Sequence, residues 1–189
     1  MRLMQSLEAD GLLLEPQVAG HAEAMFALLS DPGLYRWLDD APPADVASLR
    51  ARYQRLETRK SADGRQQWLN WIVRRPGQPP LGYLQATVLE DGSAWVAYLL
   101  ASAYQGQGIA TRATAAMLAH LEEAYGARRL LANVEAENGP SIRLLQRLGF
   151  RAASAEEAAR HRPTASERIF VRDRRERSDD RPVPPVPAT

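Results

Sequence analysis

The sequence predicts one α+β domain with a mixed, mostly antiparallel central sheet flanked by helices. The hydrophobic period changes between about 3.6 and 2 residues along the chain, which indicates both helices and strands. Three strand-like segments follow one another through short turns, which is typical of an antiparallel meander. Two strand–helix–strand units come next, and such units place part of a sheet in parallel.

The first elements are a short strand and two helices. Residues 12–15 are apolar and stop at Pro16, which favours a strand. Residues 21–30 carry apolar side chains at helical spacing and stop at the sequence DPG. A second helix is expected from residue 45 to about residue 60, because its apolar residues share one face.

The meander occupies the middle of the chain. Residues 67–74 are rich in aromatic and β-branched side chains, and the segments 81–89 and 94–100 have the same character. Proline and glycine at 75–80 favour a turn between the first two segments, and the sequence EDGS at 90–93 favours a hairpin turn between the second and third. These three segments are therefore expected to pair in order.

The helical period returns in the second half. We expect helices at 109–124 and 140–148, ended by Gly126 and Gly149, with a strand at 129–134 between them. Further strands are expected from Phe150 and at 169–171. The domain is predicted to span residues 1–172. Residues 173–189 are charged and proline-rich with no apolar period, so we expect a disordered tail there.

The composition narrows the possible functions. The net charge of +1 gives no support for nucleic acid as the main partner. The sequence has no cysteine, which excludes disulfides, a thiolate zinc site and a cysteine acyl-enzyme. The three histidines share no metal-ligand spacing, so no metal is expected. No apolar stretch approaches the length of a membrane span, and we expect a cytoplasmic protein with no membrane partner.

The sequence YQGQGIATRA (residues 104–113) places two glycines between a predicted strand and a predicted helix. One explanation is a plain turn that needs positive φ. The other is a cradle in which a phosphate approaches the N-terminus of the helix. Two known phosphate motifs do not match: Ile109 stands where a Walker loop has lysine, and Thr111 where a dinucleotide fingerprint has its third glycine.

Two sequence blocks resemble one protein superfamily. The segment QGQGIA (residues 105–110) resembles the Q/R-x-x-G-x-G/A pyrophosphate loop of the GCN5-related N-acetyltransferases, the GNAT superfamily. The segment NGPSIRLLQRLGF (residues 138–150) resembles the N-x-x-S/A…GF block of its ribosomal-protein-alanine acetyltransferase-like branch. The resemblance covers roughly residues 10–172 and implies a GNAT fold, in which the sheet is splayed to hold coenzyme A.

The resemblance implies a binding site for acetyl-CoA between the strands at 94–100 and 129–134. In that site the glycine loop holds the diphosphate, and backbone groups after the meander pair with the pantetheine arm. The residues implied to bind acetyl-CoA are Leu99, Leu100, Ala101, Gln105, Gly106, Gln107, Gly108, Ile109, Ala110, Asn138 and Ser141.

The superfamily transfers its acetyl group by direct attack of an amine, which needs a group that takes up a proton. Glu135 and Glu137 are the candidate bases, although solvated charges at a strand end explain each of them alone more simply. Many relatives have a tyrosine as acid where this chain has Leu145, which leaves Ser141 as the candidate. Asn138 and Ser141 could instead only cap a helix.

The aromatic residues are candidates for the wall of an acceptor pocket. Trp68 and Trp71 lie three apart on a predicted strand and should face opposite sides of the sheet, one of them in the core. Tyr35, Trp37 and Tyr83 are further candidates. His120 falls on the apolar stripe of its helix and is expected to be a core residue.

These observations predict an acetyl-CoA-dependent N-acetyltransferase acting on a primary amine. The acceptor is either a small molecule or a protein N-terminus, and the chain is a monomer or a homodimer. A CoA-binding module without turnover is an alternative, which the missing tyrosine and the lack of an acid at 94–100 favour. An RNA- or ribosome-associated protein acting through its arginines is a third possibility.

Overall fold

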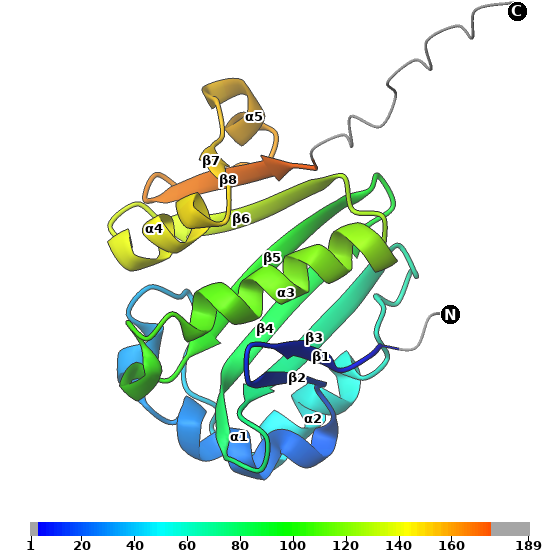
Figure 1. The fold of residues 1–189 in the computed structure, drawn as a ribbon, viewed down its shortest axis with the longest axis vertical. Helices are drawn as coiled ribbons and strands as arrows, with labels where there is room; N and C mark the ends of the chain where they lie inside the picture. Colours follow the sequence, from blue (N-terminus) through cyan, green and yellow to red (C-terminus); the bar gives the residue numbers. More distant parts are fainter. Residues whose placement is uncertain (1–3, 175–189) are drawn as a thin grey trace, which may run out of the picture.

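The computed structural model describes residues 4–174 (Figure 1). Its strands are β1 (Leu7–Ala9), β2 (Leu12–Pro16), β3 (Gln66–Arg74), β4 (Pro80–Leu89), β5 (Ser93–Leu100), β6 (Arg129–Glu135), β7 (Arg151–Ala152) and β8 (Glu167–Asp173). Its α-helices are α1 (Ala22–Leu29), α2 (Val46–Leu56), α3 (Ile109–Ala124), α4 (Gly139–Arg147) and α5 (Ala155–Ala159). Single 3₁₀ turns are η1 (Ala19–His21), η2 (Pro32–Tyr35) and η3 (Ser102–Tyr104).

The strands form one sheet in the order β1-β2-β3-β4-β5-β6-β8-β7. All neighbours are antiparallel except β5 and β6, which are parallel because α3 connects them. The predicted meander is confirmed as β3, β4 and β5, and the α+β class with a mostly antiparallel sheet is confirmed as well.

The parallel contact between β5 and β6 is short. Only three residue pairs join the strands, Ser93–Arg129, Ala94–Leu130 and Trp95–Leu131. Beyond them β5 and β6 diverge, while β5 stays paired with β4 from Ala94 to Leu100. Figure 1 shows this divergence in the middle of the sheet. The splayed sheet implied by the sequence resemblance is therefore present.

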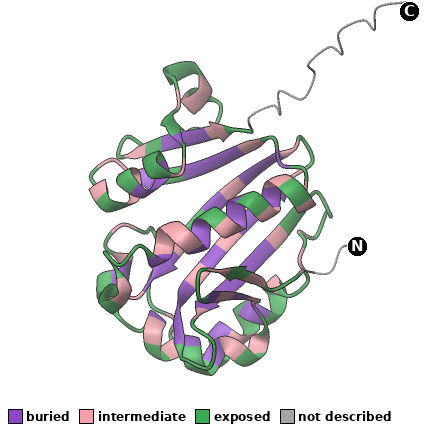
Figure 2. Cartoon of the chain, in the orientation of Figure 1, coloured by how far each residue is buried: buried purple, intermediate pink, exposed green. Residues whose placement is uncertain are grey.

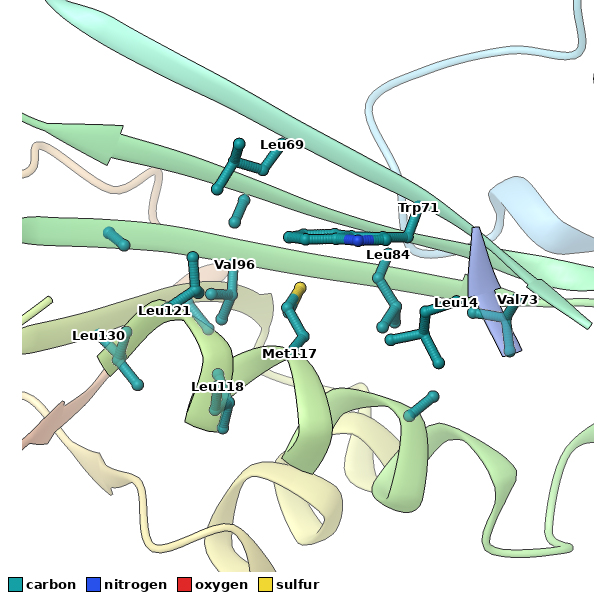
Figure 3. Close-up of a cluster of buried hydrophobic side chains, with 14 of the residues drawn as sticks. Leu14, Leu69, Trp71, Val73, Leu84, Val96, Met117, Leu118, Leu121 and Leu130 are labelled. Atoms are coloured by element: carbon teal, nitrogen blue, oxygen red, sulfur yellow. The ribbon is translucent and has the colours of Figure 1, made fainter. Parts of the chain in front are cut away.

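Helices cover both faces of the sheet. Figure 2 shows the buried residues concentrated in the strands and on the sheet-facing side of α3. The largest core lies between the sheet and α3 and contains Trp71, Leu84, Met117 and Leu121 (Figure 3). Each such side chain contributes about 1.5–3 kcal/mol by its burial. This core fixes the direction of α3 and so the position of the loop before it.

The opposite face of the sheet carries α1 and α2. A second core there contains Met25, Leu49, Tyr53, Ile72 and Leu99. Because alternate residues of a strand face opposite sides, Leu99 packs in this core whereas Leu100 packs under α3.

Some short elements were not predicted. Strand β1 forms a hairpin with β2 through Asp10 and Gly11, which have φ of 45° and 77°. Asp-Gly is a strong hairpin signal, so this pair could have been recognised. Helix α5 has five residues and a capping box between Ser154 and Glu157, and it is too short to show a hydrophobic period.

Two predicted boundaries differ from the structure. Helix α2 ends at Leu56, four residues before the expected end, and Arg59 has a φ of 58° that a helix cannot contain. Strand β8 runs to Asp173, where the tail was expected to begin. Residues 175–189 of the predicted disordered tail lie outside the described residues.

One glycine permits the close approach of β4 to the end of β5. A Cβ atom added to Gly82 would lie 2.0 Å from the carbonyl oxygen of Leu99 and 2.8 Å from the Cα of Leu100. No side chain fits there without moving backbone. Gly82 therefore sets the position of the last residues of β5, where that strand has diverged from β6.

Candidate functional site

A cleft of about 450 Å³ lies where β5 and β6 diverge. Its walls are residues 96–100 of β5 and 132–135 of β6, and the start of α3 and one side of α4 complete the lining. Cavities of this size are typical of cofactor and small-molecule sites. The cleft combines this volume with a lining from both diverging strands, so it is the candidate active site.

The glycine loop leads from β5 to α3 at one end of the cleft. Gly106 and Gly108 have φ of 75° and 73°, a conformation that L side chains rarely adopt. A Cβ atom at either position would meet nothing within 4 Å. Backbone conformation therefore requires both glycines, as a plain turn would. The open space beside them, which a turn does not require, leaves the loop accessible to a ligand.

The N-terminus of α3 suits an anion. The helix is 16 residues long and has no acidic residue in its first turn, and its N-cap is Gly108, which offers no capping side chain. Its first N–H groups and the positive end of its dipole therefore favour a negatively charged group. These features fit the diphosphate of coenzyme A.

Two glutamine side chains hold the loop. Gln105 donates from Nε2 to the carbonyl oxygen of Leu100 at 3.2 Å, and Gln107 donates to the carbonyl oxygen of Ala103 at 3.0 Å. Gln105 lines the cleft and Gln107 does not. Both amides therefore stabilise the loop in its present shape.

The cleft brings together most of the residues predicted to bind acetyl-CoA. Of these, Leu99, Leu100, Gln105, Gly106, Gly108, Ile109, Ala110, Asn138 and Ser141 line it. Ala101 and Gln107 lie outside the lining. The backbone of Ala101 is engaged on both sides, since its N–H donates to Leu81 and its carbonyl oxygen accepts from Tyr104, each at 2.9 Å.

The start of α4 faces the same cleft. Asn138 is the N-cap, and its Oδ1 accepts from the N–H of Ser141 at 3.2 Å. The Oγ of Ser141 lies 2.7 Å from the Oη of Tyr98 on β5. Burial raises the pKa of Tyr98 above its ordinary value, and the hydrogen bond with Ser141 lowers it by less.

Tyr98 was not identified from the sequence. Its alternation with Val96 and Leu100 indicates the face that it occupies, but no local pattern gives its distance from the start of α4. Leu145, where many relatives have tyrosine, is fully buried in the core. The tyrosine hydroxyl that meets Ser141 in this cleft therefore comes from β5.

The two candidate bases differ in position. Glu135, at the end of β6, is half-buried and lines the cleft, with its Oε1 3.4 Å from the Oγ of Ser166. Glu137 is exposed and does not line the cleft. Arg143 and Arg147 of α4 are exposed at the cleft wall, and the sequence analysis did not single them out.

A smaller cavity, about 30 Å³, lies on the other face of the sheet beneath α1 and α2. Tyr35, Tyr83 and the buried amides of Gln17 and Asn70 line it. Burial raises the pKa of Tyr83 to about 12. Within residues 4–174, the amide nitrogens Nε2 of Gln17 and Nδ2 of Asn70 have no hydrogen-bond partner.

The five aromatic candidates for an acceptor pocket lie in four places. Trp37 lines the cleft, and Tyr35 and Tyr83 line the smaller cavity. Trp71 is buried in the core beneath α3, edge-on to the ring of His120 at a centroid distance of 6.0 Å. Trp68 is half-buried and donates from Nε1 to Gln66. The pair of tryptophans therefore divides into one core residue and one outside it.

The described part of the chain, residues 4–174, has neither a metal-binding cluster nor a membrane-spanning helix. Within it, no group of three or more His, Cys, Asp or Glu side chains is placed to hold a metal ion. None of its helices is both long enough and apolar enough to cross a bilayer.

Comparisons with known proteins agree on one family. A family model described as an acetyltransferase (GNAT) domain matches residues 11–151. An uncharacterised N-acetyltransferase, p20, from Bacillus licheniformis is 27% identical over 149 residues, covering 78% of this chain and 83% of that protein.

Solved structures show the same fold. One is RimL, a ribosomal L7/L12 alpha-N-protein acetyltransferase in complex with coenzyme A, with a TM-score of 0.75 and 18% identity. The match covers 89% of this chain and 98% of RimL. Another is RimJ from Mycobacterium smegmatis in complex with CoA-disulfide, with a TM-score of 0.71 and 24% identity, covering 89% and 86%.

Proposed function

The chain belongs to the GNAT acetyltransferase family and is an acyltransferase, and from this premise we propose that it moves an acetyl group from acetyl-CoA to a primary amine. One observation carries the proposal. The glycine loop and the N-terminus of α3 open into the cleft formed by the divergence of β5 and β6. One acetyl-CoA molecule can therefore occupy both the cleft and the anion site at the start of α3.

Acetyl-CoA, when bound, supplies an acetyl group activated as a thioester. In our proposal Gly106, Gly108 and the first N–H groups of α3 hold its diphosphate. Arg143 and Arg147 add positive charge at the wall of the cleft, and guanidinium groups suit phosphate oxygens. Residues 96–100 of β5 offer backbone groups that β6 does not pair, which suits the extended pantetheine arm.

The acceptor in this proposal is a primary amine of a small molecule or of a polypeptide N-terminus. The RimL neighbour supports the polypeptide, because it is described as an alpha-N-protein acetyltransferase. The 3₁₀ turn η2 and the residues after it, including Leu34, Trp37 and Leu38, line the cleft. This segment would contact an acceptor that enters from the α1 and α2 side.

The attacking amine must be neutral and must lose a proton. We propose Glu135 as the base, directly or through water, because it is the one of the two candidates that lines the cleft. Ser141 is proposed to donate a hydrogen bond to the departing sulfur. Both side chains line the cleft.

A second candidate function is CoA binding without turnover. Two observations favour it: Leu145 replaces the tyrosine of many relatives and is buried, and β5 carries no acidic residue. This candidate keeps the cleft and the loop but assigns no role to Glu135.

The experiment that tests the proposal is thermal denaturation of the purified protein with acetyl-CoA, CoA, ATP or NAD. A ligand at about a hundred times its dissociation constant stabilises the native state by roughly 2.7 kcal/mol. We expect acetyl-CoA and CoA alone to raise the melting temperature. A panel of amines and N-terminal peptides with detection of released thiol then separates the enzyme from the binding module. If neither acetyl-CoA nor CoA raises the melting temperature, both candidate functions are contradicted.

A further inference from the structure

The hydroxyl groups of Tyr98 and Ser141, two residues that line the cleft, are hydrogen-bonded to each other. Their oxygens lie 2.7 Å apart, and the Oη of Tyr98 also lies 3.3 Å from the carbonyl oxygen of Ser141. Tyr98 comes from β5 and Ser141 from the first turn of α4, so the contact joins two elements that line the cleft.

The direction of the hydrogen bond decides what Ser141 can do. Each hydroxyl has one hydrogen to donate. If Ser141 donates to Tyr98, its hydrogen is used within the pair, and Tyr98 can donate to the carbonyl oxygen of Ser141. If Tyr98 donates to the Oγ of Ser141, the Ser141 hydrogen is left to point into the cleft.

We propose that Tyr98 is a positioning residue that donates to the Oγ of Ser141 and so directs the Ser141 hydroxyl hydrogen toward the thiol end of coenzyme A. This inference rests on the proposed function and assigns to it a residue from β5. Leu145 is fully buried and has no hydroxyl group that could act in this way.

Three features of the Tyr98–Ser141 pair are consistent with a hydrogen bond from the Ser141 hydroxyl to the sulfur of coenzyme A. The Tyr98 hydroxyl carries its proton at neutral pH, because the ordinary pKa of tyrosine is about 10 and burial raises it here, so Tyr98 can donate. The Oδ1 of Asn138 holds the N–H of Ser141, which fixes the backbone of the serine. Ser141 also lies in the first turn of α4, where the helix dipole favours negative charge.

The proposed hydrogen bond from Ser141 acts at the step in which the sulfur of coenzyme A leaves the acetyl group. Acetyl transfer forms one C–N bond and breaks one C–S bond, and the electron pair of the broken bond stays on sulfur. The amine proton leaves through Glu135 or water. The Ser141 hydroxyl donates a hydrogen bond to the sulfur as negative charge develops there, and Tyr98 supplies the matching bond to the Oγ.

The test compares the affinities of CoA and desulfo-CoA, which lacks the sulfur atom, by calorimetry at one pH. We expect the wild-type protein to bind CoA about three- to tenfold more tightly than desulfo-CoA, the range of one net hydrogen bond. Tyr98→Phe should reduce this ratio toward one and leave the affinity for desulfo-CoA within about twofold. Ser141→Ala should do the same, and the double variant should lose nothing more.

Tyr53→Phe is the matched control, because Tyr53 is a buried tyrosine on the opposite face of the sheet. It should keep the wild-type ratio. Melting curves show whether Tyr98→Phe is folded, and Ser141→Ala tests the same pair if it is not.

Two results would overturn the inference alone: equal binding of CoA and desulfo-CoA by the wild-type protein, or an unchanged ratio in Tyr98→Phe. If neither ligand binds, the proposed function fails and this inference fails with it.

Discussion

At the scale of single residues, Gly108 tests whether the loop binds coenzyme A or is only a turn. Its φ is 73°, so alanine is strained there by roughly 1–2 kcal/mol. If the loop holds a diphosphate, Gly108→Ala should also weaken CoA binding by more than about tenfold, because the methyl group occupies the open face of the loop. Melting curves and calorimetry measure the two effects.

Gly64→Ala is the matched control for Gly108→Ala. Gly64 has a φ of 75° and the same open surroundings, and it lies in the turn before β3, away from the cleft. It should lose similar stability and keep the wild-type affinity for CoA. If Gly108→Ala and Gly64→Ala bind CoA equally tightly, the glycines of the loop are needed only for the backbone conformation of a turn.

The site residues differ in how well the sequence predicts them. The glycine loop could be recognised because its conformation and its ligand both require contiguous residues. Tyr98 could not, because its role depends on the distance between a strand and a helix start 43 positions apart. Glu135 and Glu137 look alike in the sequence, and only the turn after β6 determines that one lines the cleft.

At the scale of elements, the approach of β4 to β5 gives a second prediction. Gly82→Ala should destabilise the fold by about 1–3 kcal/mol, the range for overpacking, because its Cβ meets backbone. It should also weaken CoA binding, since the displaced residues Leu99 and Leu100 line the cleft.

Gly20→Ala serves as the control for Gly82→Ala. Gly20 has open surroundings and an ordinary φ, so alanine is tolerated there. Denaturant titration and CoA calorimetry compare the two variants. Wild-type stability in Gly82→Ala would contradict the close packing of these strands.

A third prediction concerns the attachment of α5. Glu157 accepts from Arg151 through two bonds of 2.8 and 2.9 Å and also bonds Arg129, so it ties α5 to β7 and β6. The bonds from Arg151, the N–H of Ser154 and Arg129 lower the pKa of Glu157 well below its ordinary value of 4.5.

The sign of the pH effect follows from the lowered pKa. The native protein holds the Glu157 proton less tightly than the unfolded chain, so the stabilisation is present above pH 4.5 and is lost as the pH falls. Glu157→Gln should therefore lower the melting temperature at pH 7, with a smaller difference at pH 3. Glu156→Gln, which removes only an exposed pair with Arg160, should change little at either pH.

At the scale of the whole molecule, three parallel residue pairs and the packing of α3 and α4 hold the two parts of the sheet together. A ligand in the cleft contacts both parts. We therefore expect CoA to slow amide hydrogen exchange most in residues 132–135 and in α4, by more than its stabilisation of the whole fold slows the long β3–β4 ladder. Slowing that is no greater in residues 132–135 and α4 than in the ladder, or no slowing at all, would contradict binding in this cleft.

The order of the main elements could be predicted because each has a clear hydrophobic period. The meander, α3 and α4 were expected from the spacing of residues such as Leu84, Met117 and Leu145, which the structure buries. The divergence of β5 and β6 has no such signal. It was expected only from the resemblance, because the periodicity of a strand shows which side chains are buried and cannot show where pairing with a neighbour stops.

The same divergence changes how the molecule can meet other polypeptides. An open sheet ordinarily has two edges, but residues 96–100 of β5 and 132–135 of β6 form two more inside this one, since no described strand pairs with them on the cleft side. Such edges recruit extended chains by β-augmentation. A ligand that covers them therefore also protects the protein from strand-to-strand aggregation.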